Sequence, residues 1–188
     1  DTLSFNINGG TTITNVSTGM TVTPVTGGYD CSYQVQSVLT DGTNTINITV
    51  ADNDRNTSDV TSITFTVDTV PPALSLTGPA DGSYTNQATI AVAGTTDDVN
   101  SKPITVTITL NGVDQGVVTL NGTEFSKDIT LANGINTIVV RATDNAGLYS
   151  EIIRTITLDT AGPVINSVSI VPNPVDSGAT FIITVEIA

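Results

Sequence analysis

The sequence contains no histidine and no tryptophan, and its only cysteine is Cys31. Without histidine, the usual general base of serine and cysteine hydrolases is missing, and so are the common zinc ligand sets. A single cysteine cannot close a disulfide within the chain. We therefore predict that the chain is not an enzyme. Cys31 lies in an alternating segment, where we expect a small core side chain or an inert thiol.

Basic residues are also scarce, because 5 Lys and Arg stand against 18 Asp and Glu and give a net charge of −13. Nucleic acid is excluded as a partner, since neutralising phosphates requires clustered Lys or Arg. No apolar run approaches the roughly 18 residues of a transmembrane helix, so we expect no membrane insertion by this segment. With no initiator methionine or signal peptide in the sequence, we expect a processed or excised piece.

The residues that are abundant favour strands and turns. The chain has 35 Thr, 14 Ser, 16 Asn and 16 Gly, and apolar residues alternate with threonine between Asn-Gly and Asp-Gly pairs. Seven strands are predicted in the central part of the chain, at Ala73–Leu76, Thr89–Ala93, Ile104–Leu110, Val117–Leu120, Phe125–Leu131, Thr137–Ala142 and Ile152–Leu158. So many short strands in about 90 residues predict a two-sheet sandwich. Its predicted core is Val106, Ile108, Leu110, Ile129, Leu131, Ile138, Val140, Ala142, Ile156 and Leu158.

One unit is used more than once along the chain. Ile46–Thr69 matches Ile138–Thr160 at a spacing of about 91 residues, which is the signature of a repeat array. The same spacing places Val164–Ala188 on Ala73–Asp97. The first copy begins late, because Asp1 enters the repeat near the position of residue 104. The end of the chain therefore supplies the opening strands that its beginning lacks.

This repeat pattern predicts an all-β chain of tandem sandwiches. We expect an incomplete domain at residues 1–68, a complete domain at 69–160, and the opening strands of a third unit at 161–188. The strands predicted for the incomplete domain are Leu3–Ile7, Tyr29–Leu39, Thr45–Val50 and Ser62–Val67, with a threonine-rich stretch between the first two. Without its two opening strands, this domain should leave inward-facing Leu3, Phe5, Ile46, Ile48 and Phe65 partly exposed along a groove.

Three short motifs carry a resemblance to a known family. The segment from Ala142 to Gly147 (ATDNAG), the junction Leu158-Asp159-Thr160 and the junction from Asp68 to Pro72 (DTVPP) together resemble the bacterial and archaeal immunoglobulin-like (Big-type) repeats of surface proteins and adhesins. The resemblance covers nearly the whole chain. It implies immunoglobulin-like sandwiches and an extracellular, rod-like, structural role at a cell surface or in a filament. The sequence departs from the pattern at Asp52–Arg55, which lacks a counterpart of Gly147.

Acidic residues gather where two such domains would meet. Asp68 ends the first copy, while Asp97, Asp98 and Asp144 fall in loops at the facing end of the second. Calcium takes six to eight oxygen ligands and tolerates irregular geometry, so one ion bridging both domains is one interpretation. The other is that these residues form turns and solubilise the surface. No other cofactor is expected.

The mismatch between the two ends suggests an assembly. Strand addition supplies main-chain hydrogen bonds and fills apolar pockets with alternate side chains, an alternation that Phe181, Ile183 and Val185 have. We expect Val164–Ala188 of one chain to complete the first domain of the next and to build a head-to-tail homopolymer. The alternatives are a spacer from the stalk of a larger adhesin and an accessory binding module of a secreted polysaccharide-active enzyme. A cell-surface or carbohydrate ligand would then bind regions outside this segment.

Two surface features complete the sequence-based predictions. Sequons for N-glycosylation occur at Asn15, Asn47, Asn56 and Asn121. Chance predicts about four in a chain this rich in Asn, Ser and Thr, so their number carries no information. The absence of tryptophan gives little support to an aromatic platform for sugar stacking.

Overall fold

The computed structural model describes residues 2–36 and 38–188, and every regular element in them is a β-strand. Asp1, which belongs to the predicted first domain, lies outside the described residues. The same holds for Ser37, which belongs to the predicted strand Tyr29–Leu39. The strands are β1 (Thr2–Ile7), β2 (Ile13–Thr14), β3 (Met20–Val25), β4 (Gly28–Tyr33), β5 (Gly42–Ala51), β6 (Thr61–Val67), β7 (Ala73–Gly78), β8 (Ser83–Thr85), β9 (Thr89–Asp97), β10 (Thr105–Leu110), β11 (Val113–Asp114), β12 (Leu120–Asn121), β13 (Glu124–Thr130), β14 (Gly134–Thr143), β15 (Tyr149–Leu158), β16 (Ile165–Val171) and β17 (Ile182–Ile187). The all-β prediction is confirmed. Within these ranges, no helix has the length and apolar character needed to cross a membrane.

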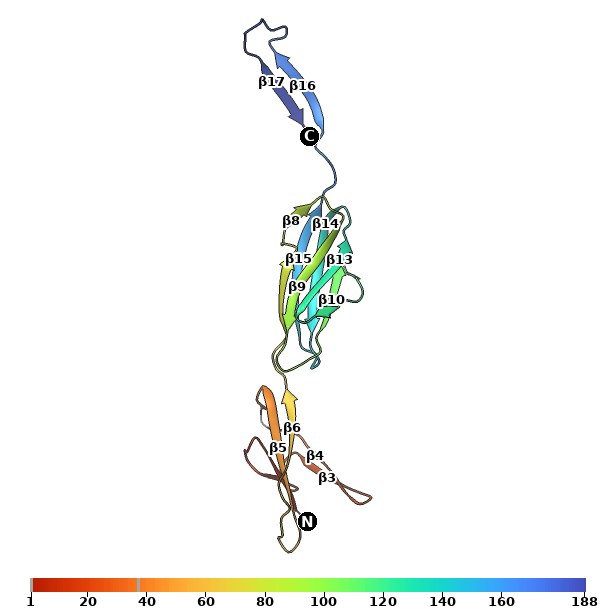
Figure 1. The fold of residues 1–188 in the computed structure, drawn as a ribbon. Helices are drawn as coiled ribbons and strands as arrows, with labels where there is room; N and C mark the ends of the chain where they lie inside the picture. The colour runs from red at the N-terminus through yellow and green to blue at the C-terminus, as the bar shows by residue number, and fades with distance from the viewer. Residues whose placement is uncertain (1, 37) are drawn as a thin grey trace.

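Figure 1 shows three bodies in a row: strands β1 to β6, then β7 to β15, then the hairpin of β16 and β17. The middle body is a sandwich of two antiparallel-rich sheets, one ordered β11-β10-β14-β15-β8 and the other β12-β13-β9-β7. Two sheets packed face to face with alternate residues inward define the immunoglobulin-like architecture that the sequence predicts.

The core of the middle body lies between its two sheets. All ten predicted core residues are buried there, with Val92 and Phe125 in addition. Burying each large aliphatic side chain contributes roughly 1.5–3 kcal/mol. Val92 lies on β9 and Phe125 on β13, both strands of the second sheet.

The structure departs from the predicted strands most clearly in three places, beyond shifts of a few residues at the strand ends. Residues 115–119 form no strand, and β12 contains only Leu120 and Asn121. Lys127 donates a hydrogen bond from Nζ to the Val117 carbonyl at 3.2 Å, so this stretch lies along the sheet edge as a loop. Tyr33 ends the strand that was predicted to reach Leu39. The short parallel strand β8, beside β15, was not predicted because it lies in a turn-rich segment.

Gly94 is a point of close approach between β9 and β7. A Cβ at this position would overlap the carbonyl oxygen of Ser75 and lie 2.9 Å from Cζ of Phe125. We predict that Gly94→Ala lowers the unfolding free energy of the middle domain by about 1–3 kcal/mol, because the added methyl overpacks the core. Chemical denaturation measures the change. Gly162→Ala is the matched control, since a Cβ at Gly162 meets nothing within 4 Å, and equal effects of the two substitutions would contradict the prediction.

The first body repeats the scaffold of the middle one, in its sheet β2-β1-β5-β6. A buried asparagine anchors the start of the long strand in both. Asn136 Nδ2 donates to the carbonyls of Ala132 and Gly134 at 2.7 and 2.9 Å, and its Oδ1 accepts from Asn111 Nδ2 at 3.0 Å.

The same network recurs at Asn44 in the first body. Asn44 Nδ2 donates to the carbonyls of Thr40 and Gly42 at 2.8 and 3.0 Å, and its Oδ1 accepts from Asn8 Nδ2 at 2.8 Å. Asn44 and Asn136 both have 0% exposure. The same buried asparagine with equivalent hydrogen bonds occurs in both sheets. The sheet of β1, β5 and β6 therefore corresponds to the sheet of β10, β14 and β15.

The first body differs from the middle one in what faces this sheet. In the middle domain, the strands β9 and β7 complete the second sheet beside β13. In the described part of the first body, only the separate hairpin of β3 and β4 and the residues that follow it occupy this side. The first sandwich therefore has one full sheet and only part of the other.

The hairpin of β16 and β17 has the pairing of β7 and β9. Leu74 pairs with Thr96, and Ile165 pairs with Ile187, each shifted by the 91-residue repeat. Each hairpin also contains one irregularity in its first strand, between Leu76 and Gly78 in β7 and between Ile165 and Ser167 in β16. The end of the chain thus forms the two-strand piece that the first body does not contain in its described residues.

Candidate functional site

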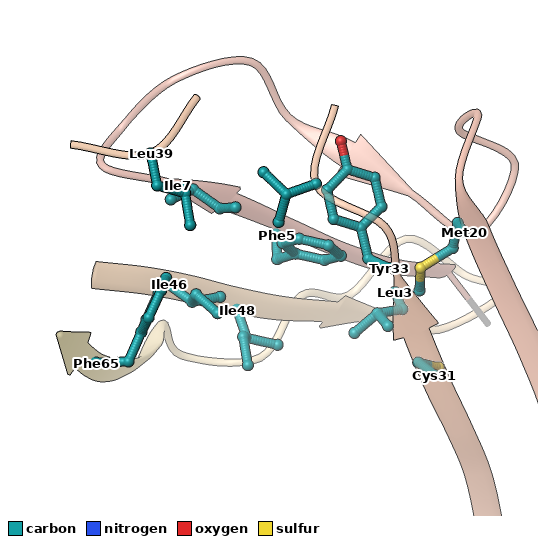
Figure 2. A pocket seen from close by; sticks show the side chains of 11 residues that line it. Leu3, Phe5, Ile7, Met20, Cys31, Tyr33, Leu39, Ile46, Ile48 and Phe65 are labelled. Carbon is teal, nitrogen blue, oxygen red and sulfur yellow. The ribbon is translucent and has the colours of Figure 1, made fainter. Parts of the chain in front are cut away.

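The first body contains a groove with a cavity volume of about 410 Å³, and its lining is almost entirely apolar. Its floor is the inward face of β1, β5 and β6. Its lining consists of Leu3, Phe5, Ile7, Met20, Cys31, Tyr33, Val35, Leu39, Ile46, Ile48 and Phe65. Figure 2 shows Phe5, Ile46 and Ile48 reaching into this space, with Tyr33 above Phe5. The rings of Phe5 and Tyr33 meet edge to face, with their centroids 5.3 Å apart.

The groove corresponds to a filled core in the middle domain. Phe5 pairs with Ile48 across β1 and β5, as Ile108 pairs with Val140 across β10 and β14. Ile108 and Val140 are fully buried, whereas Phe5 and Ile48 are only half-buried. The difference follows from the missing strand pair, because Val92 of β9 lies in the core of the middle domain.

All five predicted groove residues, Leu3, Phe5, Ile46, Ile48 and Phe65, line this groove. The structure adds Ile7, Met20, Tyr33 and Leu39, which sequence reasoning did not assign to it. The alternation of Ile7 with Phe5 was a usable signal. Cys31 lines the groove as an exposed thiol, so its interpretation as a core side chain is wrong.

The hairpin of β16 and β17 has one exposed apolar face. The predicted assembly residues Phe181, Ile183 and Val185 are 46%, 56% and 49% exposed. In the repeat, Ile183 corresponds to Val92, which has 0% exposure. The hairpin therefore presents to solvent the residues that its counterpart buries.

A second feature is the acidic cluster where the first body meets the middle domain. One carboxylate oxygen from each of Asp68, Asp98 and Asp144 lies within 4.8 Å of the others. Asp98 and Asp144 are buried, and Asp68 is half-buried. The sequence predicted these three residues together with Asp97, and the structure brings only the three together.

Asp97 belongs to a separate surface pair. Lys102 Nζ lies 2.8 Å from Asp97 Oδ1, and this hydrogen bond lowers the pKa of Asp97 below its usual value. Because neighbouring side chains on an extended strand point to opposite faces, Asp97 turns outward where Asp98 turns inward. The prediction that Asp97 takes part in the cluster is wrong for this reason.

Sequence reasoning missed a contact that also joins the two domains. Asp41, in the loop before β5, accepts hydrogen bonds on Oδ1 from the Thr69 amide at 2.8 Å and from the Thr69 hydroxyl at 2.9 Å. Its Oδ2 accepts from Asn100 Nδ2 of the middle domain. No pattern in the sequence links Asp41 to Asn100, since they are 59 residues apart.

The counterpart of Asp144 in the first body is Asp52. Both carboxylate oxygens of Asp52 accept hydrogen bonds from its own loop. Asp52 Oδ1 accepts from the amides of Asp54 and Asn56, and Oδ2 accepts from Asn56 Nδ2 at 2.8 Å. The hydrogen bonds from Asn56 hold the pKa of Asp52 below its usual value. The two loops nevertheless share one turn, because the amides of Arg55 and Gly147 donate to the carbonyls of Asp52 and Asp144, and both residues have a positive φ, 70° and 91°. The expected departure at Asp52–Arg55 is therefore one of sequence and not of backbone.

The four sequon asparagines lie in different surroundings. Asn15, Asn56 and Asn121 are exposed. Asn47 is half-buried in β5, where its Oδ1 accepts from Ser62 Oγ at 2.7 Å. A glycan is attached through Nδ2, which donates to Asn6 Oδ1 at 3.3 Å in Asn47 and to Asp52 Oδ2 at 2.8 Å in Asn56. Asn15 and Asn121 are therefore the more accessible sites.

The middle domain is similar in sequence to parts of larger proteins. Residues 72–160 match the family model described as glucodextranase, domain B. Bacillopeptidase F of Bacillus subtilis (strain 168) is 38% identical over 119 residues, a match that covers 63% of this chain and 8% of the relative. A solved structure, titled "Structures of Clostridium thermocellum CbhA fibronectin(III)-like modules", has a TM-score of 0.44 and 18% identity over 84% of this chain and 77% of that one.

The matched residues include every strand of both sheets of the middle domain. The match supports the immunoglobulin-like prediction, while the matching model is that of glucodextranase domain B and not a Big-type repeat. The chain spans less than a tenth of the length of Bacillopeptidase F.

Proposed function

We propose that this chain is a non-catalytic, immunoglobulin-like spacer of a larger secreted protein, holding other domains apart. The observation that carries the proposal is the closed middle domain, which matches a domain named as part of a glucodextranase. The relative named Bacillopeptidase F is also far longer than the matched region. A repeated sandwich with its elements arranged in a row fits a spacer (Figure 1).

The two exposed tyrosines of the middle domain favour a spacer over a carbohydrate-binding module. Tyr84 and Tyr149 are 78% and 52% exposed, but they lie near opposite ends of β15. Tyr84 pairs with Thr157, eight residues along the strand from Tyr149, which corresponds to about 26 Å. The guanidinium of Arg141 lies 4.1 Å from the centre of the Tyr149 ring and occupies one ring face. These two rings form no common platform for a sugar.

Small-angle X-ray scattering of the chain at low concentration tests the spacer proposal. A compact protein of this length would have a radius of gyration of about 16 Å. We expect a clearly larger value and a pair-distance distribution with a long tail, because the bodies lie in a row. A value near that of a compact protein would contradict the proposal.

Gel retardation on dextran, starch and cellulose separates the spacer from a binding module. A spacer should migrate unchanged in all three gels. Retardation that Tyr84→Ala abolishes, while Tyr149→Ala leaves it intact, would assign a carbohydrate-binding role instead.

A second function is favoured by the groove and the exposed hairpin. We propose that the β16–β17 hairpin of one chain closes the groove of a second copy, with Ile183 taking the place that Val92 holds in the middle domain. The support is the shared register of the two hairpins and the half-buried floor of the groove. Because donor and acceptor are different surfaces, the contact is head-to-tail and propagates into a filament.

A further inference from the structure

We infer that Asp68, Asp98 and Asp144 form a binding site for one calcium ion at the junction of the first and middle domains. The three ligand oxygens lie within 4.8 Å of one another. This spacing is compatible with a common ion, because two oxygens that each lie about 2.4 Å from calcium can be up to about 4.8 Å apart. Their chemistry is that of a hard cation, since all three ligands are carboxylates.

The second observation is the state of the remaining oxygens. Asp144 is 6% exposed, and its Oδ2 is shielded from solvent and has no hydrogen-bond partner. The same is true of Oδ2 of Asp68. A buried carboxylate oxygen without a partner is strongly unfavourable, and two of them beside a third carboxylate repel one another. A cation at their centre satisfies both oxygens and removes the repulsion.

The other oxygen of each carboxylate holds its own loop in place. Asp144 Oδ1 accepts from the Leu148 amide at 2.9 Å, and Asp68 Oδ1 accepts from the Val70 amide at 3.1 Å. Asp98 Oδ1 accepts from the amides of Asn100 and Ser101, both at 2.8 Å. These bonds fix the direction of each carboxylate, so the site is formed before the ion binds.

Calcium fits this arrangement better than magnesium does. The ligands come from three unrelated loops, after β6, β9 and β14, and calcium tolerates irregular geometry and six to eight oxygens. Magnesium requires a near-ideal octahedron at shorter distances. Three carboxylates leave several positions for water or backbone oxygens, which calcium accepts.

The position of the site gives it a consequence for the whole chain. Asp68 leaves the first domain, whereas Asp98 and Asp144 belong to the middle domain. An ion held by all three would join the domains and restrict bending at the linker, next to the contact of Asp41 with Thr69 and Asn100. The site would exist whatever the role of the chain, so the calcium test and the scattering test can fail separately.

Isothermal titration of the full chain with calcium, after treatment with a chelator, tests the inference. We expect one ion per chain and a rise of roughly 5 °C or more in the melting temperature of the middle domain at saturating calcium. Asp144→Asn keeps the shape and removes the charge, and it should weaken calcium binding at least about tenfold. Asp68→Asn should do the same without touching the core of the middle domain.

Asp97→Asn is the matched control, because Asp97 is paired with Lys102 outside the cluster. Its calcium affinity should stay within about twofold of the unchanged chain. The inference is overturned if calcium produces neither heat of binding nor a change in melting temperature. It is also overturned if Asp97→Asn weakens binding as much as Asp144→Asn, or if magnesium binds more tightly than calcium.

Discussion

Replacing Ile183 with aspartate should convert a self-associating chain into a monomer. Ile183 is 56% exposed on β17 and corresponds to the fully buried Val92 of the middle domain. If it fills the groove of a second copy, losing this apolar anchor costs roughly 3–5 kcal/mol of contact energy. That corresponds to a weakening of association by at least about 100-fold. Sedimentation velocity over a range of protein concentrations measures the change.

The neighbouring Ile182 provides a matched control. It is 67% exposed and points to the opposite face of the same strand, where the counterpart in the repeat, Ala91, is also exposed. Ile182→Asp should leave association nearly unchanged, since its side chain would remain in solvent. Equal weakening by both substitutions, or by neither, would rule out the proposed orientation of the hairpin.

Replacing Asn136 with alanine should lower the unfolding free energy of the middle domain by about 3–5 kcal/mol. The side chain has 0% exposure and bonds to Ala132, Gly134 and Asn111. Alanine removes all of these bonds and leaves the part-buried backbone groups of Ala132 and Gly134 without these partners. Urea denaturation followed by circular dichroism measures the loss.

Asn133→Ala is the control for this effect, because Asn133 is exposed in the same loop. It should change the unfolding free energy by less than about 0.5 kcal/mol. Asn44→Ala should disrupt the equivalent network in the first domain and leave the middle domain unchanged. A stability change of less than 1 kcal/mol for Asn136→Ala would show that the network is not a fixed part of the fold.

Much of the fold could be predicted from the sequence because alternation and turn residues act locally. Val106, Ile108 and Leu110 repeat with period two, and Asn-Gly pairs mark where the strands reverse. The segment Val117–Leu120 was predicted as a strand for the same reason, but only Leu120 lies in one and residues 117–119 form a loop. A short apolar run forms a strand only where it can pair with the edge strand of a sheet. The local sequence pattern does not specify whether such a partner is present.

The candidate sites, like the fold, were predictable only in part. The groove residues Phe5, Ile46 and Phe65 could be assigned because a repeat with missing strands must leave its inward face uncovered. The acidic cluster was predicted in part, since Asp68, Asp98 and Asp144 converge and Asp97 does not. Asp97 and Asp98 point to opposite sides because they are neighbours at the end of a strand. Which of the two points toward the cluster cannot be determined from the sequence. The bridge from Asp41 to Asn100 depends on how two domains meet, which no local signal encodes.

The central claim is that the first domain is an open acceptor for a hairpin like that of β16 and β17. Nuclear magnetic resonance tests it with the labelled Ile183→Asp chain, whose own donor face is disabled, titrated with an unlabelled peptide of residues 164–188. We predict saturable shift changes and nuclear Overhauser effects between Ile183 of the peptide and the groove residues Phe5, Ile46 and Ile48, with the middle domain unaffected. Absence of these contacts, with the groove signals unchanged at millimolar peptide, would contradict the account.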